Sequence, residues 1–424
     1  MKTASSAFRT IKLFSLAIIT SITLSPFAKA HQPVDHVLRI KSPENDVQKK
    51  LLLVHYMDWF ESKPISGKWG WHWTMNHYNP DIRKHGHRQI ASHYYPLIGP
   101  YDSSDPNALK CQLMLMKMSG ISGLVVDWYG TDNFYDYSNI NRNLEKLIPL
   151  VQAADLHFAV CYEDHTVALE IKGGAFSEAQ AVQHGKLLFR WMQKHLFSQS
   201  AYLKIDRKPV VLSFGNPFYT SSQWTQIFSV LPQKPLYITE SNRHGIAASC
   251  GAFDWPIPEG GTQAALKEQD TFYQRSDKWP FIIAAAFPRF HDIYSQAGVS
   301  PSLGVVKGNH GATYRTTLTK AFQSRASIIQ IVTWNDWGEG TQIEPSVEKG
   351  YQDLEITQQL SKKYGSNAGA YTSSDLRLPV KWYLLCKKYQ HNSVAEHALA
   401  PFFQLIIHHH IQKAKALLHR CEKL

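Results

Sequence analysis

Two carboxylates stand three positions apart among tryptophans in the segment 334–345, which reads WNDWGEGTQIEP. The acids are Asp336 and Glu339, and Gly338 between them permits a turn that aims both side chains into one cavity. Cleaving the bond between two sugars needs one acid to protonate the leaving oxygen and a second carboxylate as base or nucleophile. Two arbitrary acids usually mark a solvated turn, but such a turn has no use for two indoles. We therefore expect catalytic chemistry at Asp336 and Glu339.

Acids and aromatics also follow the other apolar runs of the chain. Runs typical of buried strands begin near residues 51, 123, 158, 209, 235, 252, 281 and 328. The predicted cleft residues at or just beyond their ends are Tyr56, Asp58, Trp59, Asp127, Trp128, Tyr129, Glu163, Arg289, Asp292, Trp334, Asn335, Trp337 and Glu344. One polar strand end means little, whereas the same chemistry at seven ends indicates that the ends meet around one site.

Helical patterns alternate with these eight strands, and they predict an α/β fold. We expect helices at about 106–119, 139–154, 177–197, 221–231, 262–274, 312–324 and 353–364. Eight strand–helix units in some 300 residues favour a (β/α)₈ TIM barrel over an open doubly wound sheet. No G-x-G-x-x-G loop follows a strand, which weakens the dinucleotide-binding alternative. Residues 378–424 predict two amphipathic helices.

Three segments are predicted along the 424 residues. Residues 1–30 read as a signal peptide, with basic residues, an apolar stretch and an A-x-A cleavage signal at Ala28–Ala30. The catalytic barrel is predicted at 31–365 and a helical extension packed on it at 366–424. We expect a secreted or periplasmic protein without stable membrane insertion after cleavage, and an uncleaved N-terminal anchor is the alternative.

Composition excludes several other classes of protein. The formal net charge is +11, and it falls to +7 without the leader, which carries four basic residues and no acid. This mild, dispersed surplus and the absence of a nucleic-acid motif predict no nucleic-acid partner. The five cysteines form no CxxC, so we expect mostly buried thiols, with one disulfide possible. Aromatic residues make up 12% of the chain, as stacking on sugars or a ring-rich core would require.

Metal and nucleophile alternatives are weaker. The loop histidines 72, 77, 85, 87 and 93 lack an H-E-x-x-H spacing, so we predict no metal and no other cofactor. Ser213 and Cys161 lack a nucleophile-elbow context. The triple histidine 408–410 falls in a helical pattern and reads as a partly exposed helix face.

The motif at 334–345 resembles the signature of glycoside hydrolase family 99 and its family 71/99-like relatives, which are of the endo-α-mannosidase type. Segments 95–103 (YPLIGPYDS), 127–130 (DWYG) and 288–292 (PRFHD) resemble the same family. The matching segments are spread over residues 51–360, and the first motif is the most specific.

This resemblance implies a barrel that hydrolyses α-mannosidic linkages of an oligosaccharide or polysaccharide with retention. It assigns Asp336 as base on the sugar 2-hydroxyl, giving an anhydro-sugar intermediate, and Glu339 as general acid/base. Tyr56, Trp128 and Glu163 match sugar-binding positions.

Position 336 departs from the family, which usually has glutamate there. The shorter aspartate withdraws the carboxylate by roughly 1.5 Å, and a misplacement of about 1 Å can cost a hundredfold in rate. A barrel that binds glycans without cleaving them is therefore one alternative. Another is a protein associated with polysaccharide-assembly glycosyltransferases, because a related motif also occurs in proteins of that kind. Linkage, endo or exo action and oligomeric state stay open.

Overall fold

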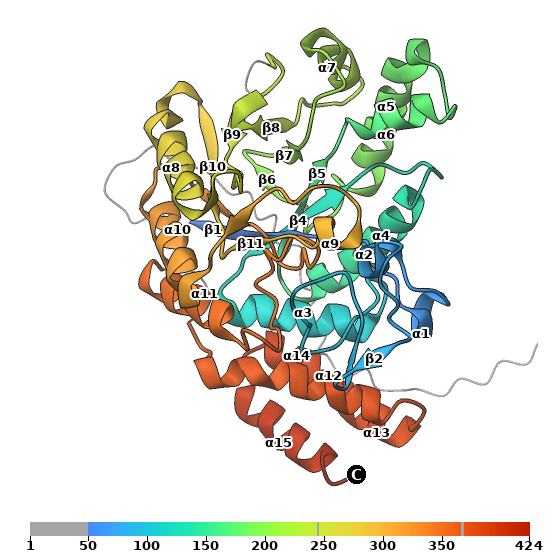
Figure 1. Ribbon diagram of the computed structural model, residues 1–424, viewed down its shortest axis with the longest axis vertical. Coiled ribbons are helices and arrows are strands. Elements are labelled where there is room, and N and C mark those ends of the chain that lie inside the picture. The colour runs from blue at the N-terminus through green and yellow to red at the C-terminus, as the bar shows by residue number, and fades with distance from the viewer. Residues whose placement is uncertain (1–49, 244–245, 366–368) are drawn as a thin grey trace, which may run out of the picture. The chain divides into compact units, whose positions relative to one another are not determined.

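The computed structural model describes residues 50–243, 246–365 and 369–424 (Figure 1). The described residues belong to one compact unit. The predicted signal peptide lies outside the described residues. Within them, no helix has the length and apolar character that crossing a membrane requires.

Eight parallel strands close into a barrel, which confirms the predicted (β/α)₈ fold. Each strand pairs with the next along the chain, and β13 returns to β1, with Leu51 opposite Ile328. The eight predicted strands are all present: β1 (Leu51–Tyr56), β4 (Gly123–Trp128), β5 (His157–Tyr162), β7 (Lys208–Ser213), β8 (Leu236–Glu240), β9 (Gly251–Phe253), β10 (Phe281–Ala286) and β13 (Ile328–Ile331). The short β6 (Lys204–Ile205) pairs antiparallel with β7.

Helices surround the barrel where the sequence predicts them. They are α3 (Pro106–Ser119), α4 (Tyr137–Ala153), α6 (Ala181–His195), α7 (Ser221–Phe228), α8 (Gly261–Gln274), α10 (Ala312–Gln323) and α11 (Gln352–Lys363). Helix α3 shows why its ends are predictable. The Asp105 carboxylate accepts the N–H of Asn107, and Gly120 ends the helix at φ 85°.

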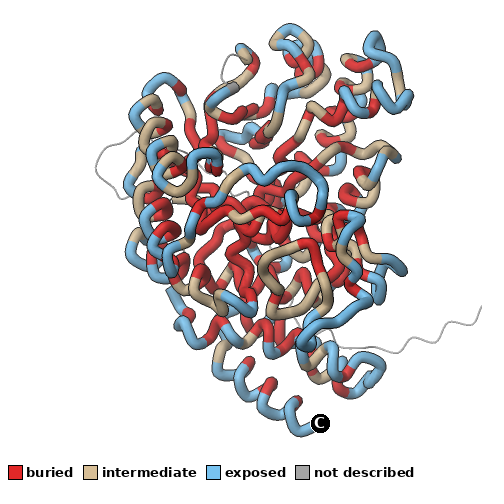
Figure 2. The backbone as a smooth tube through the Cα atoms, viewed as in Figure 1, coloured by how far each residue is buried: buried red, intermediate tan, exposed pale blue. Residues whose placement is uncertain are grey.

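Alternation along the strands separates two buried clusters. In Figure 2 the buried backbone at the centre of the molecule is red. In β1 and β4, Leu53 and Val125 belong to the cluster inside the barrel, whereas Val54 and Val126 pack with the surrounding helices. Successive side chains of a strand point to opposite faces. A polar residue at a strand end can therefore reach the barrel mouth only if it has the inward parity.

Irregular insertions follow several strand ends, and the sequence did not predict their elements. After β1 come α1 (Lys63–Ser66), α2 (Trp71–Thr74) and the hairpin β2 (Arg83–Lys84)–β3 (His87–Arg88); after β5 comes α5 (Thr166–Lys172); after β10 come β11 (Phe290–His291), α9 (Tyr294–Ala297) and β12 (Val305–Val306). Because they leave the carboxyl ends of strands, these insertions wall the mouth of the barrel.

The C-terminal region contains four helices, so the prediction of two is wrong. They are α12 (Leu378–Lys388), α13 (Ser393–Leu399), α14 (Phe402–Ile407) and α15 (Ile411–Cys421), and α12 and α14 pack on α3. The Asn392 side chain caps α13, and His409 interrupts the helical backbone after α14 with a φ of 61°. Residues 408–410 are thus an exposed connection and not a helix face.

The five cysteines are free thiols, and Cys111, Cys161 and Cys421 are buried. This confirms the expectation that most of them are buried thiols.

Candidate active site

The segment after β13 carries both motif acids on one turn. Asp336 donates its N–H to the Thr333 hydroxyl at 2.9 Å. The Asp336 carboxylate in turn accepts the N–H of Glu339 at 3.0 Å. Asp336 is buried and Glu339 is half-buried at the barrel mouth. One carboxylate therefore orients the backbone that presents the other.

Burial and nearby negative charge raise the pKa of both motif acids. Burial raises the pKa of Asp336 to about 7, and the Asp127 charge adds to the rise, against the N–H groups of Glu339 and Gly338. Burial and then the Asp336 charge raise the pKa of Glu339 well above its usual value. The Tyr294 hydroxyl, which donates to Glu339 Oε1 at 3.2 Å, opposes that rise. Two neighbouring carboxyl groups with raised pKa values of different size can serve as an acid and a base.

Further acids lie at or just beyond the ends of β1, β4 and β5, namely Asp58, Asp127 and Glu163. Burial, then the charge of Asp127, raises the pKa of both Asp58 and Glu163. The Asp58 oxygens accept no hydrogen bond from another residue that the structure describes. The charges of Glu240 and Glu339 raise the pKa of Glu163 further. Asp127 and Glu163 thus lie near enough to the motif acids for their charges to interact, and Asp58 interacts with Asp127.

Aromatic residues from the insertions form one side of the mouth, around a cavity of about 200 Å³. Trp59 stacks on His72, with ring centroids 4.0 Å apart and planes 8° apart. The lining residues are Trp59, Phe60, Trp71, His72, Met75, Tyr129, Tyr294, Asp336 and Gly338. Aromatic faces beside carboxylates suit sugar rings, which present both C–H and hydroxyl groups. Trp59 and Tyr129 thus lie where the sequence predicts them.

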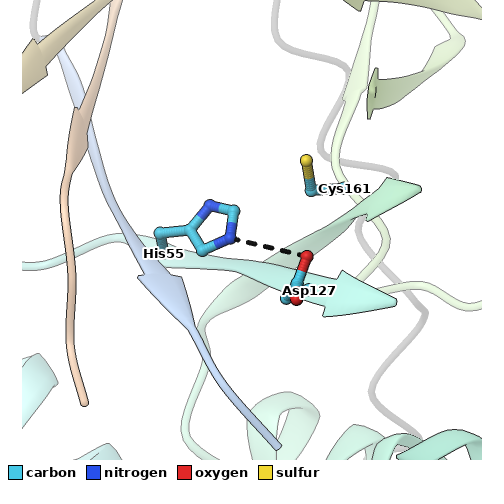
Figure 3. A group of neighbouring side chains, drawn as sticks. All are labelled: His55, Asp127 and Cys161. Atoms are coloured by element: carbon cyan, nitrogen blue, oxygen red, sulfur yellow. Dashed lines mark ion pairs between the residues drawn. The ribbon is translucent and has the colours of Figure 1, made fainter. Parts of the chain in front are cut away.

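His55, Asp127 and Cys161 are neighbours near the carboxyl ends of β1, β4 and β5 (Figure 3). His55 Nε2 lies 3.8 Å from Asp127 Oδ1, and the Trp255 ring meets His55 edge-on at 4.9 Å. Burial first, then Asp127, raises the pKa of Cys161 well above its usual value, which keeps the thiol protonated. The three donor atoms lie within 4.8 Å of one another and are of types that bind transition metals. Among the described residues, the clusters of potential metal-binding side chains do not include the loop histidines 72, 77, 85, 87 and 93.

Tyr56 and Trp128 lie on the opposite face of their strands. The Tyr56 hydroxyl donates to Gln112 of α3 at 2.7 Å, and the Trp128 indole donates to Asn141 of α4 at 3.1 Å. Both are buried between barrel and helices. The structure therefore does not bring these two predicted sugar-binding residues to the cleft. Their neighbours His55 and Asp127 have the inward parity instead.

Asn335 and Trp337 fasten the catalytic turn to the end of β1. The Asn335 side chain accepts the N–H of Met57 and donates to its carbonyl, both at 2.8 Å, and it donates to the Tyr101 hydroxyl at 3.0 Å. The Trp337 indole donates to the same hydroxyl at 3.3 Å. Both motif residues are fully buried, so they position the turn and do not line the cleft.

Glu344 and Trp334 complete this support. Glu344 accepts hydrogen bonds from the Tyr101 hydroxyl and from Gln112 Nε2, both at 2.8 Å. Burial raises its pKa to about 7, against the hydrogen bonds of Gln112 and Tyr101. Trp334 is fully buried. The end of the motif is thereby tied to α3.

Arg289 and Asp292 hold the loops after β10. Arg289 is buried, pairs with Asp353 of α11 and donates to the Gln342 carbonyl at 2.7 Å. The Asp292 carboxylate accepts the N–H of Tyr294 at 3.2 Å and that of Leu303 at 2.8 Å. Asp292 therefore orders the segment that brings Tyr294 to Glu339.

Replacing Asn335 by alanine is expected to lower the free energy of unfolding by about 2–4 kcal/mol. The change removes three buried hydrogen bonds and leaves both backbone groups of Met57 without a partner. Urea unfolding followed by tryptophan fluorescence measures the loss. The exposed Asn133→Ala is the control, with an expected change within about 0.5 kcal/mol. Equal unfolding midpoints for the two variants would contradict the supporting role of Asn335.

Tyr294, His72 and Tyr101 are partners of the site that the sequence does not predict. Tyr101 lies in the segment 95–103 that carries part of the family resemblance, and Tyr294 follows the segment 288–292. Those segments are the available signals. His72 is predicted only as a weak candidate metal ligand, because nothing in a single sequence indicates that it stacks on Trp59.

An eight-stranded barrel with an acidic, aromatic mouth is typical of TIM barrels that act on carbohydrates. No family model matches the chain. The chain is 22% identical to mouse glycoprotein endo-alpha-1,2-mannosidase over 360 residues, 74% of this chain and 75% of the mouse protein. It is 24% identical to the human glycoprotein endo-alpha-1,2-mannosidase-like protein over 328 residues, 69% and 68% of the two chains.

A solved structure with the same fold is the GH99 endo-alpha-mannosidase from Bacteroides thetaiotaomicron. The TM-score is 0.57 at 18% identity, over 75% of this chain and 98% of the bacterial one. The protein is therefore glycoside hydrolase family 99-like, as the motifs predicted.

Proposed function

We propose that this protein is a retaining α-mannosidase that cleaves internal linkages of α-linked, mannose-containing glycans. The observation that carries the proposal is the single turn on which the Asp336 carboxylate accepts the N–H of Glu339, where burial raises the pKa of both acids. Its relatives by sequence are named endo-alpha-1,2-mannosidases, which supports the choice of linkage and endo action.

The geometry supports a two-step mechanism. Ionised Asp336 takes the proton of the sugar 2-hydroxyl, whose oxygen attacks the anomeric carbon. Protonated Glu339 gives its proton to the departing glycosidic oxygen, and a 1,2-anhydro sugar forms. Glu339 then takes a proton from water, which opens the anhydro ring, and Asp336 returns its proton to the 2-oxygen. Asp127, whose charge acts on both Asp336 and Glu339, supplies negative charge near the developing oxocarbenium ion.

Incubation with α-1,2-linked mannooligosaccharides tests the proposal. We expect the newly formed reducing end of the product to be the α-anomer. Proton NMR spectra recorded before mutarotation measure this. Binding of the same sugars with no products after prolonged incubation would favour a glycan-binding barrel. The specific observation behind that second candidate is the short side chain at Asp336.

We further propose export of the mature chain from a cleavage site near Ala30. The A-x-A signal after a basic and apolar leader supports this proposal. N-terminal sequencing of protein recovered from the medium or periplasm tests it, and a mature chain that still begins at Met1 would contradict it.

The rate is expected to follow a bell-shaped pH profile near neutrality. Asp336 must be ionised, so kcat/KM falls as pH drops below its raised pKa of about 7. Glu339 must be protonated, so kcat/KM falls again as pH rises through its raised pKa. Because the Tyr294 hydrogen bond lowers the pKa of Glu339, Tyr294→Phe is expected to move the alkaline limb to higher pH. An acid limb near pH 4 would contradict the raised pKa of Asp336.

A further inference from the structure

A second hollow, of about 520 Å³, lies on the insertion between β1 and α3, beside the catalytic cleft. We call it the basic groove and define it by Lys84, His87, Arg88, His93, Tyr94 and Tyr95. Its volume is in the range of small-molecule sites. Its lining combines Lys84, His87, Arg88 and His93 with the rings of Tyr94 and Tyr95, in contrast to the acids of the cleft.

The charge of the groove is positive. Lys84 is exposed on β2, and the Arg88 guanidinium lies 5.1 Å above the Trp69 ring and donates to the Pro80 carbonyl at 2.7 Å, which holds it in place. Glu348 is the acid among the lining residues, and its carboxylate accepts the N–H of Tyr95 at 3.0 Å. An anion therefore meets more cationic than anionic groups here.

One wall separates the basic groove from the cleft. Its buried centre is Met75, Ala91, Ile293 and Ala297, with Tyr78 and Tyr294 packed against it. Tyr78 lines the groove, and Tyr294 lines the cleft. A ligand that extends out of the cleft across this wall enters the groove.

A histidine pair joins the groove to the catalytic turn. The His93 ring stacks on His291, with centroids 3.7 Å apart and planes 4° apart. His93 Nε2 also hydrogen-bonds the Asp292 carbonyl at 3.0 Å. The His291 N–H donates to the Glu339 carbonyl at 2.8 Å. The position of the groove relative to Glu339 is thus defined by direct contacts.

From this arrangement we propose that the basic groove binds an anionic sugar residue of the glycan, one that bears a sulfate, phosphate or carboxylate group. The inference rests on the proposed function, since it names the substrate class of the same site. The tyrosine rings receive the sugar face, and Lys84 and Arg88 receive the anion. The acidic cleft repels such a group, so an anionic substrate needs a separate basic subsite along its chain.

Matched oligosaccharides test the proposal. Isothermal titration calorimetry compares a neutral α-1,2-mannotetraose with the same chain bearing one terminal sulfate, phosphate or uronate, at low and high salt. The anionic chains are expected to bind the protein about tenfold more tightly at low salt, with the preference reduced as salt rises. The three anionic arms show which group is preferred.

Two charge-reversal variants locate the effect. Lys84→Glu is expected to remove the roughly tenfold preference for the anionic chains. Lys146→Glu, at an exposed site on α4, makes the same change in net charge and is expected to retain the preference. Equal affinity of wild-type protein for neutral and anionic chains, or equal effects of the two variants, overturns the inference. Preferential binding of anionic chains with no cleavage of any chain keeps the inference and overturns the proposed hydrolysis.

Discussion

Glu339→Gln is expected to lower kcat on an unactivated α-mannoside by roughly three orders of magnitude, the usual scale for loss of a general acid/base. Glutamine has the shape of glutamate and can still accept the Tyr294 hydrogen bond. It cannot give a proton to the departing oxygen. The loss should be smaller for an aryl mannoside, whose leaving group needs little protonation, so the ratio of the two rates reports the role directly.

A loss of activity in Glu339→Gln reports on catalysis only if the variant is as stable as the wild-type protein. Burial raises the pKa of Glu339, so the folded state disfavours its ionised form, and its contribution to stability is lost as pH rises. Removing that charge should not destabilise the protein at neutral pH. Thermal unfolding checks this, and the exposed Glu259→Gln provides the matched control of wild-type activity. If Glu339→Gln keeps more than about a tenth of the wild-type rate on the unactivated substrate, the assignment of Glu339 is wrong.

The barrel is predictable because its strands are short aliphatic runs that are buried on both faces. The runs at β1, β4 and β13 give a signal that does not depend on distant partners. The order of strands then follows from the alternation with helices, since parallel neighbours need a crossover. Fold class and the identity of the mouth therefore come from local pattern alone.

Side-chain direction is the part of the site that local pattern predicts poorly. The sequence predicts both Asp127 and Trp128 in the cleft, because both lie at the end of the same strand. Parity separates them, because Asp127 faces the barrel interior while Trp128 donates to Asn141 of α4. The period of two along β4 is enough to place the two side chains on opposite faces of the strand, although it does not say which face is the inner one.

The supporting network is beyond the reach of a single sequence. Asn335 bonds Met57 across 278 positions, and Glu344 bonds Tyr101 across 243. Such pairs leave no periodic pattern in the sequence. The sequence around Asn335 and Trp337 therefore predicts a ligand site in the same way whether these side chains contact a ligand or the backbone. The insertion after β1 is similar, since α1 and α2 are one-turn elements held by contacts such as the Trp73 indole on the Tyr101 carbonyl.

Asp336→Asn is expected to lower kcat by roughly two to four orders of magnitude, because an amide cannot take the proton of the sugar 2-hydroxyl. Its side-chain oxygen can still accept the N–H of Glu339, so the turn should keep its shape. Asp336→Glu, the residue usual in the family, moves the carboxylate by roughly 1.5 Å. In this backbone we expect it to cost about a hundredfold, since the turn holds the shorter side chain. If Asp336→Glu is as active as the wild-type protein or more active, the short side chain of Asp336 does not suit this backbone better than glutamate.

The substrate can be varied to separate a base from a nucleophile at Asp336. A 2-deoxy-2-fluoro mannoside with a good leaving group has no 2-hydroxyl proton, so the anhydro route is closed. Wild-type protein is then expected to show no turnover and no gain in mass. A carboxylate nucleophile would instead form a glycosyl ester on Asp336, visible by intact-protein mass spectrometry. Because Asp336 already accepts the N–H of Glu339 with one oxygen, the other oxygen is the one available to the sugar.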